Sequence, residues 1–370
     1  MEKSNLKLIV LPNFENFGKL VDSHLKIIRK NNEGFLTPTN VVRFNNSEGK
    51  VVIDGHIIGQ DVYILSDVGN YSETYTMYGF ENHKSYDDHY QDIKRTISAL
   101  SGEAGRINLI TPLLYASRQH KRKGNESLDC AMALHELEFL GVDRIITFDA
   151  HDATIQTALN KTSFKNLYPT YSILKSLIKN EDINIDNLLV ISPDNGAVDR
   201  AIYYADVIQS DVGIFHKRRD YSILEKGKHP IVAHEYLGKQ IEGKDVIIVD
   251  DMIASGGSMI DVAEDLKERG ANKIFLITTF ALFTEGKNSI DTFNKAYEKK
   301  LFDKLYTTNL SYIPNSVQSL DWIETVDCSK YLAKIIDRFN NNESISDLSN
   351  GSTKAKILTL INQKRNGTLN

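Results

Sequence analysis

The stretch DVIIVDDMIASGGS, residues 245–258, decides the fold. Its β-branched run, VIIV, predicts a buried strand of a parallel sheet, and the pattern over 259–270 predicts an amphipathic helix that ends at a glycine. Two adjacent carboxylates and a short Gly/Ser loop stand between these elements. A strand, a tight loop and a helix in this order form one α/β unit.

The loop has the chemistry of a sugar-phosphate site. Gly256 and Gly257 allow the backbone to approach an anion closely, and the helix start directs unpaired N–H groups and the positive end of its dipole at a phosphate. The two carboxylates before the loop can accept hydrogen bonds from vicinal sugar hydroxyls or hold a cation. The alternative is an acidic turn that caps an ordinary crossover helix. We favour the site, because carboxylates at the end of a buried strand are costly without partners.

Length, charge and cysteine content limit the class of protein. The chain has 370 residues, more than one typical domain, which favours two cores. A net charge of -5 argues against a nucleic-acid surface. The sequence has no apolar stretch that could cross a bilayer and no signal peptide, so we expect a cytoplasmic protein without a membrane partner. Cys130 and Cys328 lack a partner motif and are expected to be small buried hydrophobes.

One phrase recurs along the chain. GEAGRINLIT at 102–111, LGVDRIITFD at 140–149 and RGANKIFLIT at 269–278 each join a glycine helix exit to a basic residue and a β-branched run. Helical patterns over 92–100 and 128–140 lie between them. A recurring helix-strand unit predicts parallel α/β architecture.

Because the phrase occurs in both halves, we expect two similar α/β domains, each a parallel sheet flanked by helices. We place the first at 1–165 and the second at 166–315, followed by a closing segment at 316–350, which has one helical pattern and is expected to pack on the N-terminal domain. The basic tail, 351–370, carries no chemical signal, and its sequence fits either a disordered or a packed segment.

Two further strand ends carry acidic or imidazole groups. In RIITFDAHD, 144–152, His151 follows a predicted strand and could contact a metal or a nucleotide, although a structural histidine is the alternative. In SPDNGAVDRA, 192–201, Asp194 could be a helix cap, or it could join His151 in holding a magnesium-bound triphosphate.

Three segments offer groups for a nucleotide. GIFHKRRD, 213–220, places three cations where we expect the chain to leave a strand; such runs are usually solvated surface, but a transferring phosphoryl group would need them. YASRQHKRKGNES, 115–127, is either a generic basic loop or a base-reading and phosphate-pairing one. In RFNNSEG, 43–49, Phe44 could stack on a purine while Glu48 accepts from its exocyclic amine.

In this order, over residues 40–350, the segments resemble the ribose-phosphate pyrophosphokinases, also called phosphoribosyl diphosphate synthetases. VDDMIASGGS is similar to that family's ribose-5-phosphate loop, SPDNGAVDRA to its Asp/Gly turn, KRR to its catalytic loop and TFDAHDATIQ to its histidine segment. The resemblance implies two phosphoribosyltransferase-like domains. It also implies transfer of the diphosphoryl group of Mg-ATP to the C1 hydroxyl of ribose 5-phosphate, giving 5-phosphoribosyl 1-diphosphate and AMP for nucleotide biosynthesis.

The resemblance also implies residue roles. Ribose 5-phosphate would be bound by Arg219, Asp250, Asp251, Ala254, Ser255, Gly256, Gly257 and Ser258, and Lys217 and Arg219 would serve the transfer. ATP would contact Phe44, Asn46, Ser47, Glu48, Arg118, Gln119 and His151, and Mg²⁺ would lie at His151 and Asp194. In the family a neighbouring subunit supplies the hairpin around Asn46. We therefore expect a homo-oligomer built from dimers, a hexamer being one such assembly.

The chain departs from the family pattern at several positions. The family usually has Asp where Ala254, Asn46 and His120 stand and Gly where Ala197 stands, and the region 67–92 is longer and more polar here. Two other functions stay open on the sequence. One is a type I phosphoribosyltransferase, which shares the acidic-pair loop; the other is a catalytically weak paralogue that regulates an active synthetase.

Overall fold

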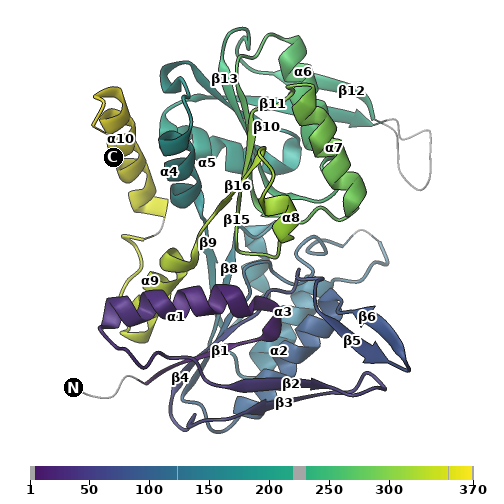
Figure 1. Cartoon of the computed structure of the whole chain (residues 1–370), viewed down its shortest axis with the longest axis vertical. Helices are drawn as coiled ribbons and strands as arrows, with labels where there is room; N and C mark the ends of the chain where they lie inside the picture. Colours follow the sequence, from purple (N-terminus) through teal and green to yellow (C-terminus); the bar gives the residue numbers. More distant parts are fainter. Residues whose placement is uncertain (1–4, 123, 220–230, 349, 369–370) are drawn as a thin grey trace. The chain divides into compact units, whose positions relative to one another are not determined.

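The computed structural model describes residues 5–122, 124–219, 231–348 and 350–368, without the side chains at 217–219, 231–234 and 350. The chain divides into two compact units (Figure 1). No helix in these ranges has the length and apolar character to cross a membrane. The N-terminal unit comprises Met1–Pro169, Asn309–Tyr312 and Asp327–Ser349, and the C-terminal unit comprises Thr170–Thr308, Ile313–Val326 and Asn350–Asn370.

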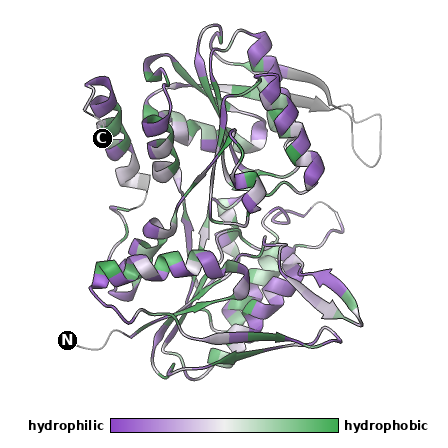
Figure 2. Ribbon diagram, in the orientation of Figure 1, coloured by the Kyte–Doolittle hydropathy of each residue, from purple (hydrophilic) through white to green (hydrophobic). Residues whose placement is uncertain are grey.

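The N-terminal unit contains a five-stranded parallel sheet of order β1-β4-β7-β8-β9. Every residue of β4 is buried, as expected for a strand covered on both faces. Helix α1 buries Phe17, Val21 and Leu25 at helical spacing, and its ribbon alternates hydrophobic and hydrophilic turns (Figure 2). The strands are β1 (Leu6–Val10), β4 (Asp61–Leu65), β7 (Arg106–Ile110), β8 (Arg144–Phe148) and β9 (Ser163–Leu167); the helices are η1 (Pro12–Phe14), α1 (Glu15–Arg29), α2 (Tyr86–Leu100), α3 (Asp129–Phe139), η2 (Ala153–Ala158) and α9 (Ser329–Asn340).

The same unit carries two antiparallel hairpins outside the main sheet. The first joins β2 (Thr39–Arg43) to β3 (Gly49–Ile53), and the second joins β5 (Thr74–Met77) to β6 (Phe80–His83). The second hairpin lies within the long polar region 67–92, where no strand was predicted.

The C-terminal unit contains a seven-stranded sheet of order β12-β11-β10-β13-β14-β15-β16. All neighbours are parallel except β11 and β12. Its strands are β10 (Leu188–Ser192), β11 (Asp211–Arg219), β12 (Ile231–Leu237), β13 (Asp245–Ile253), β14 (Ile274–Ala281), β15 (Lys304–Thr308) and β16 (Ile323–Val326); its helices are α4 (Thr170–Asn180), η3 (Ile185–Asn187), η4 (Asn195–Ala197), α5 (Val198–Ile208), α6 (Gly257–Glu268), α7 (Lys287–Glu298), α8 (Asn315–Gln318) and α10 (Asn350–Arg365).

The parallel α/β architecture predicted from the repeated phrase is confirmed, because its three copies lead into β7, β8 and β14. Strand β13 is longer than predicted. It continues through the acidic pair to Ile253, because β14 pairs with it up to that residue. On its other side, β10 pairs with β13 only as far as Ile248. The acidic pair therefore lies on a strand that extends past one of its two neighbours.

The tail folds into helix α10, which packs against α4 and α5 of its own unit. Ile357, Leu360 and Ile361 are buried in the apolar cluster that these helices share with the sheet. The ammonium group of Lys364 donates to the carbonyl oxygens of Ile178 and Glu181 at the end of α4. Those carbonyls have no partner within α4, so the tail satisfies a helix terminus as well as covering an apolar face.

We predict that Ile357→Ala lowers the free energy of unfolding by about 2 to 4 kcal/mol, because the side chain is 0% exposed and its removal leaves a cavity. The measurement is equilibrium urea unfolding of the full chain. Asn362→Ala, at an exposed position of the same helix, is the control and should change it by less than about 0.5 kcal/mol. Equal effects of the two substitutions would show that α10 does not depend on this packing.

Candidate functional site

The loop that follows β13 has a backbone shape that requires glycine. Gly256 precedes the first residue of α6 and has φ 90°, ψ -14°. A Cβ atom at this position would lie 2.2 Å from Cε2 of the buried Phe293. At Gly257 a Cβ atom would meet nothing within 4 Å. Gly256 thus fixes the loop, while the space beside Gly257 is open to an incoming group.

Unpaired donors gather where α6 begins. The N–H groups of Met259 and Ile260 both donate to the carbonyl oxygen of Gly256. Within the described ranges, the N–H groups of Gly257 and Ser258 have no acceptor. The first turn of α6 contains no acidic side chain. This end of the helix therefore presents N–H groups and positive potential, which suit a phosphate.

The acidic pair lies close to a cation on another element. Asp251 is 3% exposed, and its N–H donates to Oδ1 of Asp250 at 2.9 Å. Nη1 of Arg200, on α5, lies 3.7 Å from the same oxygen. Burial and then the carboxylate of Asp251 raise the pKa of Asp250 well above its usual range, while Arg200 opposes the rise. Donors such as sugar hydroxyls, or a cation, would relieve this concentration of negative charge.

Sequence reasoning missed Arg200. The available signal was its position one turn into the helix that follows SPDN, at an edge of the sheet where two carboxylates were already expected. A buried pair of acids predicts a nearby cation, but the sequence does not say which one.

Asp194 makes the capping contact that the sequence left as an alternative to metal binding. Its Oδ1 accepts from the N–H of Gly196 at 2.8 Å, at the start of η4. Its charge also contributes to the raised pKa of Asp250, so the side chain belongs to the same electrostatic environment. The cap therefore fixes a carboxylate near the acidic pair.

The predicted catalytic cations begin in a strand. Lys217 and Arg219 were expected where the chain leaves a strand, and they lie among the last three residues of β11, which extends through Arg219. Pairing with β12 prolongs it, with Lys217 opposite His234 and Arg219 opposite Ile231. The side chains of Lys217 and Arg219 and all of 220–230 lie outside the described part of the chain.

In the N-terminal unit, the loop carrying Arg118 and Gln119 is tied to the histidine segment. Nε2 of His120 lies 3.3 Å and Nζ of Lys121 lies 2.9 Å from Oδ2 of Asp152. The rings of His120 and His151 are 5.3 Å apart between centroids. Hydrogen bonds from Thr154 and Lys121 hold the pKa of Asp152 well below its usual range.

The structure therefore brings together two segments that were predicted separately. Arg118, Gln119 and His151 are all exposed on them. His120 stands where the family usually has Asp, and here it gains a carboxylate partner on the histidine segment.

The turn 44–48 connects β2 to β3 in the same unit. Phe44 is 48% exposed, and its N–H donates to the carbonyl of Glu48 at 2.7 Å. Oδ1 of Asn46 accepts from the N–H of Glu48 at 3.2 Å. An aspartate could accept the same bond, so the replacement in this chain keeps the turn while removing a charge.

Among the described residues, no three or more His, Cys, Asp or Glu side chains form a group that could hold a metal ion. His151 and Asp194 belong to different units, so their joint role stays a prediction. A single carboxylate such as that of Asp194 suits Mg²⁺, which prefers oxygen ligands and retains several waters.

We predict that Gly256→Ala lowers stability by more than about 1 kcal/mol, because the added methyl group meets Phe293 and alanine disfavours φ 90°. Gly257→Ala is the matched control, and its thermal midpoint should be unchanged or raised, since the space is open and the position begins a helix. Thermal unfolding by circular dichroism measures both. Equal midpoints would contradict the packing described for Gly256.

Two family models, one for each half of the chain, come from the same protein family. Residues 6–141 match the family model for the N-terminal domain of ribose phosphate pyrophosphokinase, and residues 222–350 match that for the phosphoribosyl synthetase-associated domain.

Among curated relatives, ribose-phosphate pyrophosphokinase 2 of Schizosaccharomyces pombe is 30% identical over 310 residues, covering 83% of this chain and 88% of the relative. Ribose-phosphate pyrophosphokinase of Vibrio parahaemolyticus is 28% identical, covering 85% of this chain and 92% of the relative. The crystal structure of phosphoribosylpyrophosphate synthetase from Mycobacterium smegmatis shares the fold, with a TM-score of 0.74, 22% identity and coverage of 91% of this chain and 99% of that one. The chain belongs to the ribose-phosphate pyrophosphokinase family of transferases.

Proposed function

We propose that this protein transfers the diphosphoryl group of Mg-ATP to the C1 hydroxyl of ribose 5-phosphate, giving 5-phosphoribosyl 1-diphosphate and AMP for nucleotide biosynthesis. The proposal is carried by one observation in a chain of this family: open N–H donors at the start of α6 lie directly after a carboxylate pair on β13. These two features match the two ends of a sugar phosphate.

Ribose 5-phosphate fits this arrangement in one orientation. Its phosphate would accept from the N–H groups of Gly257 and Ser258 and from the hydroxyls of Ser255 and Ser258, within the loop that begins at Ala254. The ribose hydroxyls would donate to Asp250 and Asp251. The raised pKa of Asp250 supports this, since hydroxyl donors would relieve the negative charge that burial and Asp251 concentrate there.

The nucleotide would use the N-terminal unit. Phe44 would stack on the purine and Glu48 would accept from its amine, next to Asn46 and Ser47 of the same turn. Arg118, Gln119 and His151 would contact ATP. The loop that carries Arg118 and Gln119 is joined to the segment that carries His151 by the contacts of His120 and Lys121 with Asp152. In this proposal the turn comes from a neighbouring subunit, so the active protein is a homo-oligomer.

The reaction is an in-line displacement. The C1 oxygen of ribose 5-phosphate forms a bond to the β-phosphorus of ATP, the bond from that phosphorus to the oxygen bridging to the α-phosphate breaks, and AMP leaves. The C1 hydroxyl loses its proton to solvent. Lys217 and Arg219 would neutralise charge on the transferring group. Asp194 and His151 would hold Mg²⁺, which would supply further positive charge when bound.

We predict that the purified protein forms AMP only when ATP, ribose 5-phosphate and Mg²⁺ are all present. A coupled assay for AMP, with each component omitted in turn, measures this. Conversion of added 5-phosphoribosyl 1-diphosphate and a base to a nucleotide would instead indicate a phosphoribosyltransferase. Nucleotide binding without any AMP would indicate a regulatory paralogue.

We predict that Lys217→Ala lowers kcat about 10² to 10³-fold and changes the affinity for ATP little, because the cation acts on charge that develops in the transition state. Steady-state kinetics and equilibrium binding of ATP separate the two effects. Arg218→Ala, at the adjacent cation for which the resemblance implies no role, is the control. Small and equal changes in turnover and affinity for Lys217→Ala would count against the role.

A further inference from the structure

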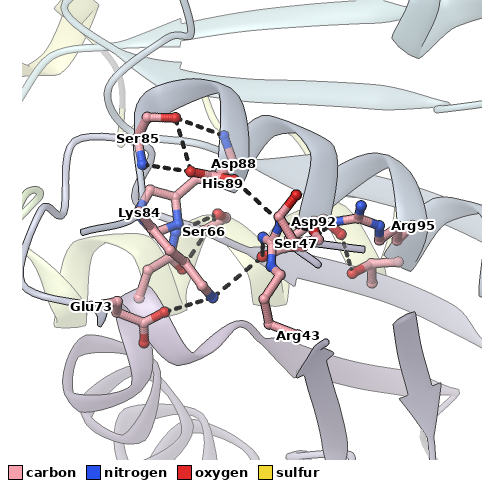
Figure 3. Close-up of polar contacts among 12 residues, drawn as sticks. Arg43, Ser47, Ser66, Glu73, Lys84, Ser85, Asp88, His89, Asp92 and Arg95 are labelled. Carbon is pink, nitrogen blue, oxygen red and sulfur yellow. Dashed lines mark hydrogen bonds and ion pairs between the residues drawn. The ribbon is translucent and has the colours of Figure 1, made fainter. Parts of the chain in front are cut away.

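The turn 44–48 is held by a cation at its base. Arg43 is the last residue of β2, and its side chain is only 7% exposed. Its Nη1 donates to the carbonyl oxygen of Ser47 at 3.2 Å, and also to Oδ1 of Asp88 at 3.2 Å (Figure 3). The guanidinium group therefore connects the turn to helix α2.

That guanidinium group is itself fixed by a charge cluster. Its Nη2 donates to both oxygens of Asp92, at 3.1 and 3.0 Å. Asp92 also accepts from Arg95 at 2.7 Å and lies 3.3 Å from Nζ of Lys84, which pairs with Glu73 at 2.9 Å (Figure 3). Three cations face three carboxylates in this cluster, so it is electrically balanced although largely buried.

The second hairpin holds the turn at another point. The N–H of Tyr78, between β5 and β6, donates to the carbonyl of Asn45 at 2.9 Å. The guanidinium carbon of Arg43 lies 5.1 Å from the centre of the Tyr75 ring. Tyr78 is 75% exposed, and its bond to the turn is made by its backbone.

The turn needs such support. A two-stranded hairpin is marginally stable by itself, and Ser47 has φ 72°, a conformation that disfavours a residue with a side chain. The carbonyl of Asn45 accepts from Tyr78 and that of Ser47 accepts from Arg43. Because these two carbonyls lie on either side of Asn46, the two hydrogen bonds fix the backbone at the centre of the turn.

We propose that Arg43 and the β5–β6 hairpin are positioning elements, which hold the turn 44–48 in the conformation that reads the nucleobase. The inference rests on the proposed function in one respect, the assignment of this turn to the nucleotide. Arg43 touches no reacting atom in this proposal; it acts through the carbonyl of Ser47.

The first test compares Arg43→Lys with Arg95→Lys. Both keep a cation beside Asp92, but only the first loses the fork that reaches the turn. We expect Arg43→Lys to raise KM for ATP about tenfold, with kcat and KM for ribose 5-phosphate within about twofold, since one charge-assisted hydrogen bond is lost. Arg95→Lys should change all three by less than about twofold. Equal effects of the two variants would overturn the inference.

The second test addresses the hairpin. A variant that replaces residues 75–82 with Asn-Gly joins the paired residues Thr74 and His83 by a short turn and keeps Glu73 and Lys84. It should raise KM for ATP as Arg43→Lys does. Tyr78→Asn retains the N–H and tolerates φ 48°, so KM should stay within about twofold. A large rise for Tyr78→Asn would show that the ring contacts the nucleotide, which contradicts a backbone role.

A readout without activity separates this inference from the proposed function. Hydrogen exchange should be faster at the amides of 44–48 in Arg43→Lys and in the shortened-hairpin variant than in the unmodified protein and Arg95→Lys. Unchanged exchange would reject the positioning role even if AMP forms. Faster exchange with no AMP from the unmodified protein would retain the support of the turn and reject the proposed reaction.

Discussion

The candidate sugar-phosphate site depends on one pairing, that of β13 with β14. This ladder continues to Ile253, whereas β10 leaves β13 at Ile248. Without the longer ladder, the acidic pair would lie in a loop and could not be held at a defined place before α6. The pairing satisfies the backbone on one side, and the shorter β10 leaves room on the other for the turn that carries Asp194. The register of the sheet therefore sets the position of every acidic group proposed for the site.

The site combines opposite potentials within a short stretch of chain. Asp250 and Asp251 concentrate negative charge on the last part of β13, and the start of α6 presents N–H donors a few residues later. A ligand with hydroxyl donors at one end and an anion at the other matches both. A simple anion matches only the second, because the carboxylates repel it. The guanidinium group of Arg200 offsets part of this negative charge, but the pKa of Asp250 remains raised.

Local sequence patterns predicted which helices and strands form better than they predicted where each one ends or which side chains it contacts. Glycine exits and β-branched runs located β7, β8 and β14, because periodicity and turn chemistry act over a few residues. The end of β13 depends on a neighbouring strand, and the partner of Asp250 stands on α5, fifty positions earlier in the chain. Such features arise from tertiary packing, which a single sequence does not encode in a local pattern. The β5–β6 hairpin was missed because its strands have only four residues each and lie in a polar region, and α10 was left open because its sequence is largely polar.

The interleaving of the two units constrains when each can be completed during synthesis. The N-terminal unit includes Asp327–Ser349, and Nε of Arg29 pairs with Asp337 at 2.7 Å. The C-terminal unit likewise includes α10, the last helix of the chain. Helix α9 packs on α1, and α10 packs on α4, so the apolar surfaces of α1 and α4 stay exposed until segments synthesised much later fold back onto them. Until those segments have been synthesised, a nascent chain with this topology needs protection from premature association.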